Sequence, residues 1–169
     1  DLPILAEKGH ELGCHTFHHF PAWATTPSQY AASSEENIRA NISHFPAGHL
    51  DTHSYPISYP RPKTKRLIAK RFRAARGGGQ VSNRDTVDLN YLSSFFLEQS
   101  RDNFEAVETA LSECVASRGW LIFSTHDICP TPTPYGVTEN FFRRVVEATL
   151  ASRVHIVTMS RALDLMRVP

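Results

Sequence analysis

Short apolar runs alternate with helix-like patterns along most of the chain. Helical spacing is clearest over residues 103–118, and a continuous apolar run at 120–125 is typical of a buried strand. The apolar positions of the helical segment are Phe104, Val107, Leu111 and Val115. Alternating strands and helices predict an α/β fold built from β–α units, with parallel strands and the helices outside them.

Three further strands are expected, at residues 11–14, 53–57 and 154–158. The first of them delivers His15 at its C-terminal end, and the later apolar run delivers His126 in the same way. In parallel α/β folds the catalytic groups gather at the C-terminal ends of the strands. We therefore expect these two histidines to meet in space although they are far apart in the sequence.

Several residues mark the ends of the expected helices. Ser33, with Glu36 three residues later, has the pattern of a capping box, and Thr138 precedes an amphipathic segment. Gly119 is expected to end the helix of residues 103–118, and the three glycines at 77–79 are expected to end a basic helix. A short helix is expected after the last strand.

The composition is that of an ordinary globular protein and argues against several functional classes. Hydrophobic residues make up 41% and charged residues 21% of the 169 residues, which suits one packed domain. The net charge of +1 argues against nucleic-acid binding. No apolar stretch is long enough to span a membrane. The 3 cysteines include no Cys-x-x-Cys pair, so neither a disulfide framework nor a zinc knuckle is indicated.

The segment around His15 carries the strongest chemical signal. His15 and His19 are four residues apart, and on one helical turn this spacing would point both imidazoles the same way. Two such imidazoles suit a borderline metal ion such as zinc. The alternative is a histidine-rich surface turn without a ligand role. His18 is expected to point away from the pair, towards solvent or substrate.

His126 carries the second signal. It stands with Asp127 where the apolar run ends abruptly, which is how a fold places a catalytic group over its core. The alternative is that His126 only caps the strand by hydrogen bonding to the next loop. Either interpretation is compatible with the sequence pattern alone.

Together the two histidine segments resemble the polysaccharide deacetylase family, the metal-dependent carbohydrate esterases. Its His-Ser/Thr-x-x-His motif is matched by residues 15–19, and the preceding Gly-His-Glu-Leu-Gly at 9–13 is similar to its usual lead-in. A later strand of the family ends in a histidine, as residues 121–126 do here, and the loop at 134–136 is similar to one bacterial branch. The resemblance covers nearly the whole chain. It implies an incomplete (β/α) barrel, with residues 1–169 as one domain that lacks its N-terminal strand or strands.

The resemblance also implies a mechanism. A divalent metal ion, zinc foremost, would be held by His15, His19 and an aspartate, and would activate water. A second aspartate would act as general base, and His126 as the general acid that protonates the leaving amine. Asp88 is the candidate for orienting His126, although an aspartate there could also cap a helix. The implied activity is hydrolysis of carbon–nitrogen bonds that removes acetyl groups from N-acetylated polysaccharide or oligosaccharide.

The chain departs from the family pattern at two places. The family has an Asp-Asp motif upstream of the histidine motif, whereas Asp1 is the sole aspartate before His15. We therefore predict that the isolated chain binds metal poorly and does not deacetylate. The third motif, Arg-x-Pro-Tyr-Gly, is matched at Pro56 but not at its arginine or its Tyr-Gly pair. The expected substrate-binding residues are Tyr55, Pro56, Arg61 and Tyr135, the last by stacking on a sugar ring.

These departures leave two functions open. The first is a deacetylase that is truncated upstream, and the second is a non-catalytic protein of the same fold that binds glycan or another partner. Loss of a central parallel strand would expose a sheet edge. A homodimer that covers this edge is therefore a further expectation.

Overall fold

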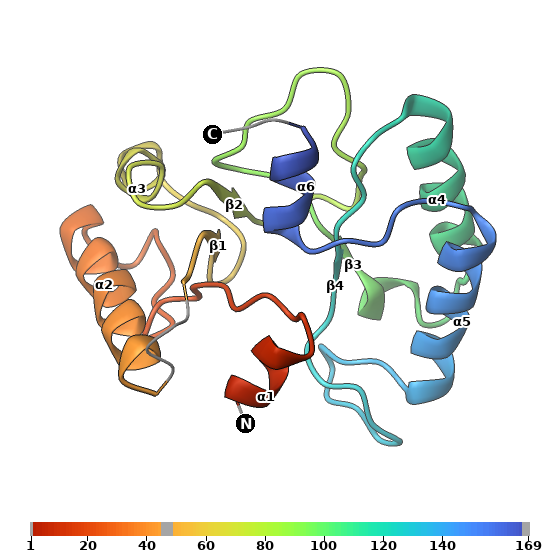
Figure 1. Cartoon of the computed structure of the whole chain (residues 1–169), viewed down its shortest axis with the longest axis horizontal. Helices are drawn as coiled ribbons and strands as arrows, with labels where there is room; N and C mark the ends of the chain where they lie inside the picture. The colour runs from red at the N-terminus through yellow and green to blue at the C-terminus, as the bar shows by residue number, and fades with distance from the viewer. Residues whose placement is uncertain (1, 45–48, 167–169) are drawn as a thin grey trace. The chain divides into compact units, whose positions relative to one another are not determined.

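The computed structural model describes residues 2–44 and 49–166 (Figure 1). The chain divides into two compact units. Unit 1 draws on residues 1–77, 88–92 and 157–169, and unit 2 draws on residues 78–87 and 93–156. Each unit is described by itself, and the expectation of a single domain stays a prediction.

The sheet of unit 1 consists of short parallel segments that pair in chain order. β1 (Thr52–Ser54) pairs in parallel with β2 (Ala74–Arg76). Cys14 forms a parallel bridge with His53 of β1, and Leu92 forms one with Arg76 of β2. Each segment therefore lies beside its neighbour in the sequence. Of the strand expected at residues 11–14, only Cys14 pairs.

The described residues of unit 1 include the helices α1 (Leu2–Glu7), α2 (Pro27–His44), α3 (Pro62–Ile68) and α6 (Met159–Leu165). The capping box of α2 lies at Thr26 and Gln29. The backbone N–H of Gln29 donates to the Thr26 hydroxyl (3.2 Å), and the backbone N–H of Thr26 donates to the Gln29 side chain (3.1 Å). The prediction that Ser33 begins this helix is therefore wrong, because proline is well suited to the first helical position after Thr26.

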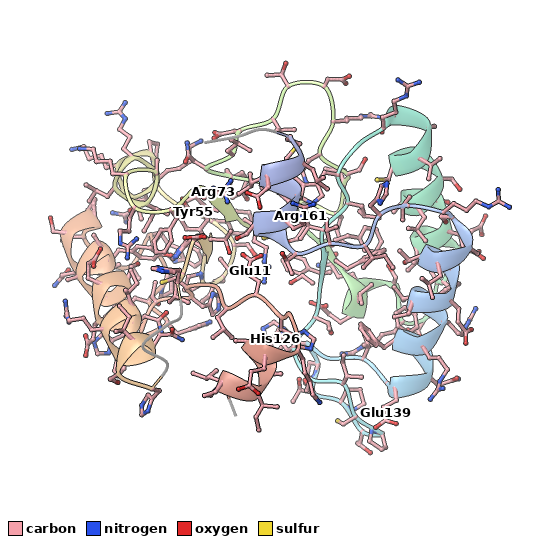
Figure 2. The ribbon with its side chains drawn as sticks, in the orientation of Figure 1. Glu11, Tyr55, Arg73, His126, Glu139 and Arg161 are labelled. Carbon is pink, nitrogen blue, oxygen red and sulfur yellow. The ribbon has the colours of Figure 1, made fainter. Side chains whose placement is uncertain are left out.

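Glu11 ties the first segment of unit 1 to β1 and to α6 (Figure 2). One carboxylate oxygen accepts from the Thr52 hydroxyl (2.5 Å), and the other accepts from the backbone N–H of Ser160 (2.8 Å). Ser160 lies in the first turn of α6, where backbone N–H groups lack partners within the helix. This carboxylate therefore fixes the segment that leads to His15.

Unit 2 contains one parallel strand pair and two α-helices of 13 residues each. β3 (Phe95–Phe96) pairs with β4 (Phe123–Ser124), and η1 (Leu97–Ser100) follows β3 directly. The helices are α4 (Glu105–Ser117) and α5 (Glu139–Ala151). Apolar side chains from all these elements form one buried cluster, whose buried members include Phe95, Leu97, Val107, Leu111, Phe141 and Val145.

The helix predictions for unit 2 are largely confirmed. Thr138 caps α5 by accepting from the backbone N–H of Phe141 (3.2 Å). α4 occupies nearly the expected range, but Arg118, with a φ of 51°, is the left-handed residue at its end, not Gly119. Gly119 is still required, because an added Cβ would lie 2.9 Å from the carbonyl oxygen of Asn83.

The structure corrects the expected strands. Residues 154–158 form no strand, and β4 is shorter than the apolar run at 120–125. The expectation that residues 53–57 form a strand holds only for β1. The described part of the chain is therefore mixed α/β with short parallel strands in small sheets, and it contains no closed barrel. Within the same residues, no helix combines the length and apolarity that crossing a membrane requires.

Candidate metal-binding and catalytic residues

The segment from His15 to His19 is a loop, so the expected helical turn is wrong. Thr16 and His19 have left-handed backbone conformations, with φ of 59° and 54°. The Thr16 hydroxyl accepts from the backbone N–H of His19 (3.1 Å), which closes the loop. The imidazoles of His15 and His19 nevertheless lie side by side, with ring centroids 4.8 Å apart.

His15 is oriented by the backbone of β1. Its Nδ1 atom lies 2.7 Å from the carbonyl oxygen of Ser54. Because a carbonyl only accepts, Nδ1 carries the proton and Nε2 carries the lone pair. Metal-binding histidines commonly have this arrangement, in which a carbonyl fixes the tautomer and the ring. In the neutral ring, Nε2 is therefore the atom that a metal-ligand role would use.

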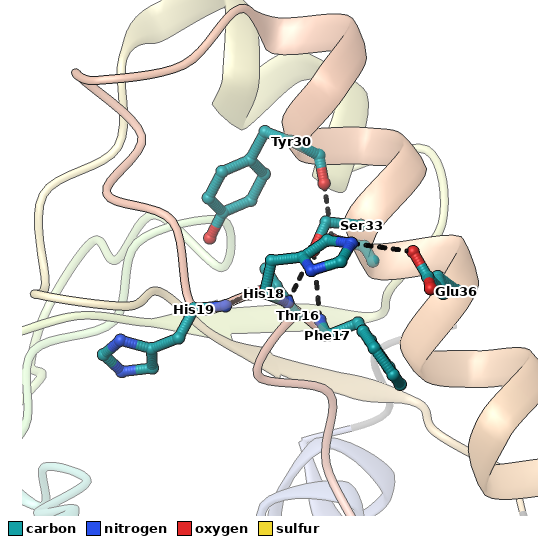
Figure 3. Close-up of polar contacts among 8 residues, drawn as sticks. Thr16, Phe17, His18, His19, Tyr30, Ser33 and Glu36 are labelled. Atoms are coloured by element: carbon teal, nitrogen blue, oxygen red, sulfur yellow. Dashed lines mark hydrogen bonds and ion pairs between the residues drawn. The ribbon is translucent and has the colours of Figure 1, made fainter.

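His18 faces helix α2, away from His19, as expected (Figure 3). Its Nε2 lies 3.0 Å from a carboxylate oxygen of Glu36. The Ser33 hydroxyl accepts from the backbone N–H groups of Phe17 (3.1 Å) and His18 (3.0 Å). These contacts anchor the loop on α2, so the two neighbouring imidazoles point to opposite sides of the loop.

His53 lies in the core directly beside this loop, and its burial was not among the predictions from the sequence. It is 1% exposed, and its Nε2 lies 3.0 Å from the Tyr30 hydroxyl. Its Nδ1 has no hydrogen-bond partner among the described residues. Burial above all, then the charges of His15 and Arg76, lowers the pKa of His53 to about 3. The core under the loop therefore contains a neutral imidazole.

Two of the expected substrate-binding residues are buried. Tyr55 is 2% exposed and donates its hydroxyl to the carbonyl of Asn90 (3.1 Å), and Pro56 is also buried. Side chains this deeply buried offer little surface to a ligand. The role of Tyr55 and Pro56 in substrate binding stays a prediction.

Arg61 lies in an exposed loop, close to an aromatic pair that was not predicted from the sequence. The pair consists of Trp23 and Tyr59. The Arg61 guanidinium donates to the carbonyl of Trp23. Trp23 is 42% exposed and Tyr59 is 64% exposed. The centroids of their rings are 6.4 Å apart. Tyr59 stands two residues before Arg61, but Trp23 is far from both in the sequence, so no local sequence signal links the pair. The pair offers ring faces to a ligand.

Asp88 closes a turn in unit 1. One carboxylate oxygen accepts from the backbone N–H of Asn90 (2.9 Å), and the other forms an ion pair with Lys65. Desolvation alone would raise the pKa of Asp88, but the hydrogen bonds from Lys65 and Asn90 and the charge of Lys65 outweigh it and lower the pKa. No helix begins there, so the capping alternative is wrong. Orientation of His126 by Asp88 stays a prediction, because the two belong to different units.

His126 follows β4 in unit 2 and is exposed (Figure 2). Its backbone nitrogen and its Nδ1 both lie 3.3 Å from the carbonyl oxygen of Tyr135. The Tyr135 ring is 62% exposed, and its centroid lies 5.5 Å from that of the imidazole. The expected meeting of His126 with His15 and His19 stays a prediction, because those residues belong to unit 1.

The loop after His126 is closed by Asp127. Its carboxylate accepts from the backbone N–H of Thr133 (2.8 Å) and from the Thr133 hydroxyl. These hydrogen bonds from Thr133 lower the pKa of Asp127 to about 2. Gly136 is required beside it, because an added Cβ would lie 2.3 Å from the Asp127 carbonyl oxygen. The loop that carries Tyr135 is therefore fixed internally.

The histidine pair fits part of a metal site. Catalytic zinc sites in proteins usually have three protein ligands and structural sites four. Among residues 2–44 and 49–166, no group of three or more His, Cys, Asp and Glu side chains is placed to hold a metal ion. His15 and His19 supply two imidazoles at suitable spacing. A third ligand is not identified within that part of the chain.

Comparison with known proteins adds no functional information. No family model, no curated protein and no solved structure matches this chain. The deacetylase resemblance therefore rests on the sequence motifs alone.

Proposed function

We propose that this chain carries the histidine part of a metal-dependent deacetylase site that acts on N-acetylated glycans. The observation that carries the proposal is the His15–His19 pair. The two ring centroids are 4.8 Å apart, and Nδ1 of His15 is bound to the carbonyl of Ser54 at 2.7 Å. A loop that needs two left-handed residues to bring the imidazoles together is costly for a surface turn without a role.

The fold that we propose is an incomplete (β/α) barrel. Support comes from the strand pairing within each unit. In unit 1 the parallel segments follow chain order from Cys14 through β1 and β2 to Leu92, and in unit 2 β3 pairs in parallel with β4. Barrels of this class place consecutive parallel strands side by side. His15 follows the first of these segments, which is the end at which such barrels place their catalytic groups.

The proposed roles follow from the ring nitrogens. His15 and His19 would hold a divalent metal ion, with zinc as the first choice for imidazole ligands, together with an aspartate from outside the described residues. Such an ion, when bound, polarises a carbonyl and makes water nucleophilic at neutral pH. The exposed Nε2 side of His126 would donate a proton to the departing amine of the glucosamine unit, since a histidine can carry that proton near neutral pH.

The substrate surface is assigned to exposed side chains. Tyr135 lies beside His126, and Trp23 and Tyr59 form an exposed pair within unit 1. Faces of aromatic rings suit the C–H-rich faces of pyranose rings, and Arg61 fixes the Trp23 backbone. Arg61 would therefore contribute to substrate binding by holding the backbone of Trp23.

A second candidate function is a non-catalytic protein of the same fold that binds glycan or a partner protein, including a second copy of this chain. The observation that favours it is the histidine pair without a third ligand among the described residues. Exposed aromatic side chains would serve such binding equally well. Glycan binding without acetate release separates the two functions.

Zinc titration of the 169-residue chain tests the histidine pair. We expect weak binding that His19→Ala weakens at least about tenfold, since even indirect perturbation of a metal ligand costs this much. His18→Ala is the matched control, because His18 faces Glu36 and should leave zinc binding unchanged. Equal zinc affinity of the wild type and His19→Ala would refute the proposed site.

Acetate release tests the reaction itself. Chitooligosaccharides are incubated with zinc and either the 169-residue chain or the longest reading frame that contains it. We expect no release from the 169-residue chain. Where the longer protein contains an Asp-Asp pair, we expect release that is abolished in His126→Ala. A longer protein that binds zinc and glycan but releases no acetate would leave only the non-catalytic function.

A further inference from the structure

We propose that the backbone carbonyl of Tyr135 orients His126, and that Arg101 is the positioning residue that holds this carbonyl in place. The resemblance assigns the orienting role to an aspartate, so the inference replaces a carboxylate with a peptide group. The catalytic role of this inference rests on the proposed function. The tautomer that the inference specifies for His126 is independent of the proposed function.

The contacts of His126 select one ring nitrogen. Nδ1 and the backbone nitrogen of His126 converge on the same acceptor, the carbonyl oxygen of Tyr135, each at 3.3 Å. A carbonyl cannot donate, so the contact requires a proton on Nδ1. Neutral His126 therefore carries its lone pair on Nε2, on the side away from Tyr135.

The adjacent carboxylate is already occupied. Both oxygens of Asp127 accept from Thr133, one from its hydroxyl and one from its backbone N–H (2.8 Å). Neighbouring side chains of an extended segment also point to opposite sides. Asp127 therefore stabilises the loop and does not orient the imidazole of His126.

Arg101 holds the peptide groups on both sides of Tyr135. Its Nε donates to the carbonyl of Gly136 (2.7 Å), and its Nη2 donates to the carbonyl of Thr133 (2.7 Å). The backbone N–H of Gly136 donates to the carbonyl of Thr133 (3.1 Å), which closes the turn. With these neighbours fixed, the carbonyl of Tyr135 keeps its direction towards His126.

The guanidinium is suited to this task because its donors lie in one plane at fixed angles. A lysine would keep the positive charge but could not present the same fork to two carbonyls. Loss of Arg101 would release the turn at Thr133 and Gly136 and, through it, the Tyr135 carbonyl. The imidazole would then lose its preference for a proton on Nδ1.

Nitrogen-15 NMR of the 169-residue chain measures this tautomer directly. Imidazole spectra are recorded near pH 8.5, about two units above the ordinary histidine pKa, and the His126 signals are assigned with His126→Gln. We expect the Nδ1–H form to dominate. A dominant Nε2–H form in the wild-type chain would overturn the proposal without any variant.

Arg101→Gln tests the positioning role. We expect the ratio of Nδ1–H to Nε2–H to fall by about two- to tenfold, the range that one hydrogen bond of ordinary net strength provides. Arg143→Gln, on the exposed face of α5, is the matched control and should leave the ratio unchanged. Arg101→Lys serves if Arg101→Gln loses its dispersed amide spectrum. An unchanged ratio in a folded Arg101 variant would exclude Arg101 as the positioning residue.

The outcome is separable from that of the proposed function. An Nδ1–H tautomer in a protein that never releases acetate supports this inference and counts against catalysis. Acetate release by a protein whose His126 carries its proton on Nε2 supports the proposed function and overturns this inference.

Discussion

The buried imidazole of His53 should make the stability of unit 1 depend on pH. His53 is 1% exposed and is surrounded by the rings of Tyr30, Tyr55 and Phe72. Burial lowers its pKa to about 3 in the folded state, whereas an unfolded chain has a histidine pKa of about 6.5. Between these values the unfolded state binds a proton that the folded state does not. Stability therefore falls as the pH falls.

The size of the effect follows from linkage. Each pH unit between about 6.5 and 3 should remove about 1.4 kcal/mol of stability, once the unfolded state is protonated and the folded state is not. The sum over the whole window of about 3.5 pH units is about 5 kcal/mol, a large share of the 5–15 kcal/mol typical of a folded domain. Stability from this group is fully present above about pH 6.5.

Urea unfolding at a series of pH values between 7.5 and 4.5 checks this prediction. In a Trp120→Phe background, the fluorescence of Trp23 reports on unit 1 alone. We expect His53→Phe to remove most of the pH slope below pH 6.5. Tyr30→Phe is the informative companion, because it removes the hydroxyl that contacts His53 but keeps the buried imidazole. It should lower stability by about 1–3 kcal/mol and keep the slope. Equal pH slopes in the wild type and His53→Phe would refute the assigned burial of a neutral imidazole.

Three further predictions concern single side chains. Thr138→Ala should lower the free energy of unfolding of unit 2 by about 1 kcal/mol, because α5 loses its N-cap, and urea unfolding followed by Trp120 fluorescence measures this. Gly136→Ala should cost about 1–3 kcal/mol or more in the same assay, since the new Cβ would overlap Asp127, whereas Pro134→Ala in the same loop should cost less. Trp23→Ala should weaken chitooligosaccharide binding several-fold in titration calorimetry with no change in the thermal midpoint of unit 2. Unchanged glycan affinity would remove Trp23 from the proposed substrate surface.

The two helices of unit 2 could be predicted because their signals are local. α4 repeats apolar residues at helical spacing, and α5 begins at a threonine cap, so neither helix needed tertiary information. The residues on the buried face of α4 were predicted less well. Val115 is 48% exposed, whereas Cys114 beside it is buried, because the packing partner decides which residues of a wide apolar stripe face inward.

The strands could not be predicted with the same success, because they are too short to carry a period. β2 and β3 contain 3 and 2 residues, and two-residue alternation cannot be recognised over such lengths. β2 was assigned to the basic helix before the three glycines, although α3 already ends at Ile68. The expected strand at 154–158 is apolar enough, but no described neighbour pairs with it.

The histidine motif correctly predicted that the imidazoles of His15 and His19 are neighbours, but it predicted the wrong backbone conformation. The four-residue spacing of His15 and His19 predicted adjacent imidazoles on a helix, and the structure brings them together in a loop. A left-handed conformation at Thr16 could not be read from the sequence, because residues other than glycine adopt it only where surrounding contacts enforce it. Here the enforcing contact is Ser33 on α2, which holds the following backbone N–H groups.

The hydrogen-bonding pattern distinguishes the histidines proposed to act in chemistry from the one in the core. His15 and His126 each place Nδ1 near a backbone carbonyl, of Ser54 and Tyr135 respectively. This contact puts the proton on Nδ1 and the lone pair on Nε2, which is the nitrogen that a metal ion or a transferred proton requires. His53 differs, since its Nε2 contacts the Tyr30 hydroxyl within the core and its Nδ1 has no hydrogen-bond partner among the described residues. Spacing in the sequence cannot separate these cases, because each depends on a carbonyl or hydroxyl supplied by another segment of the same unit.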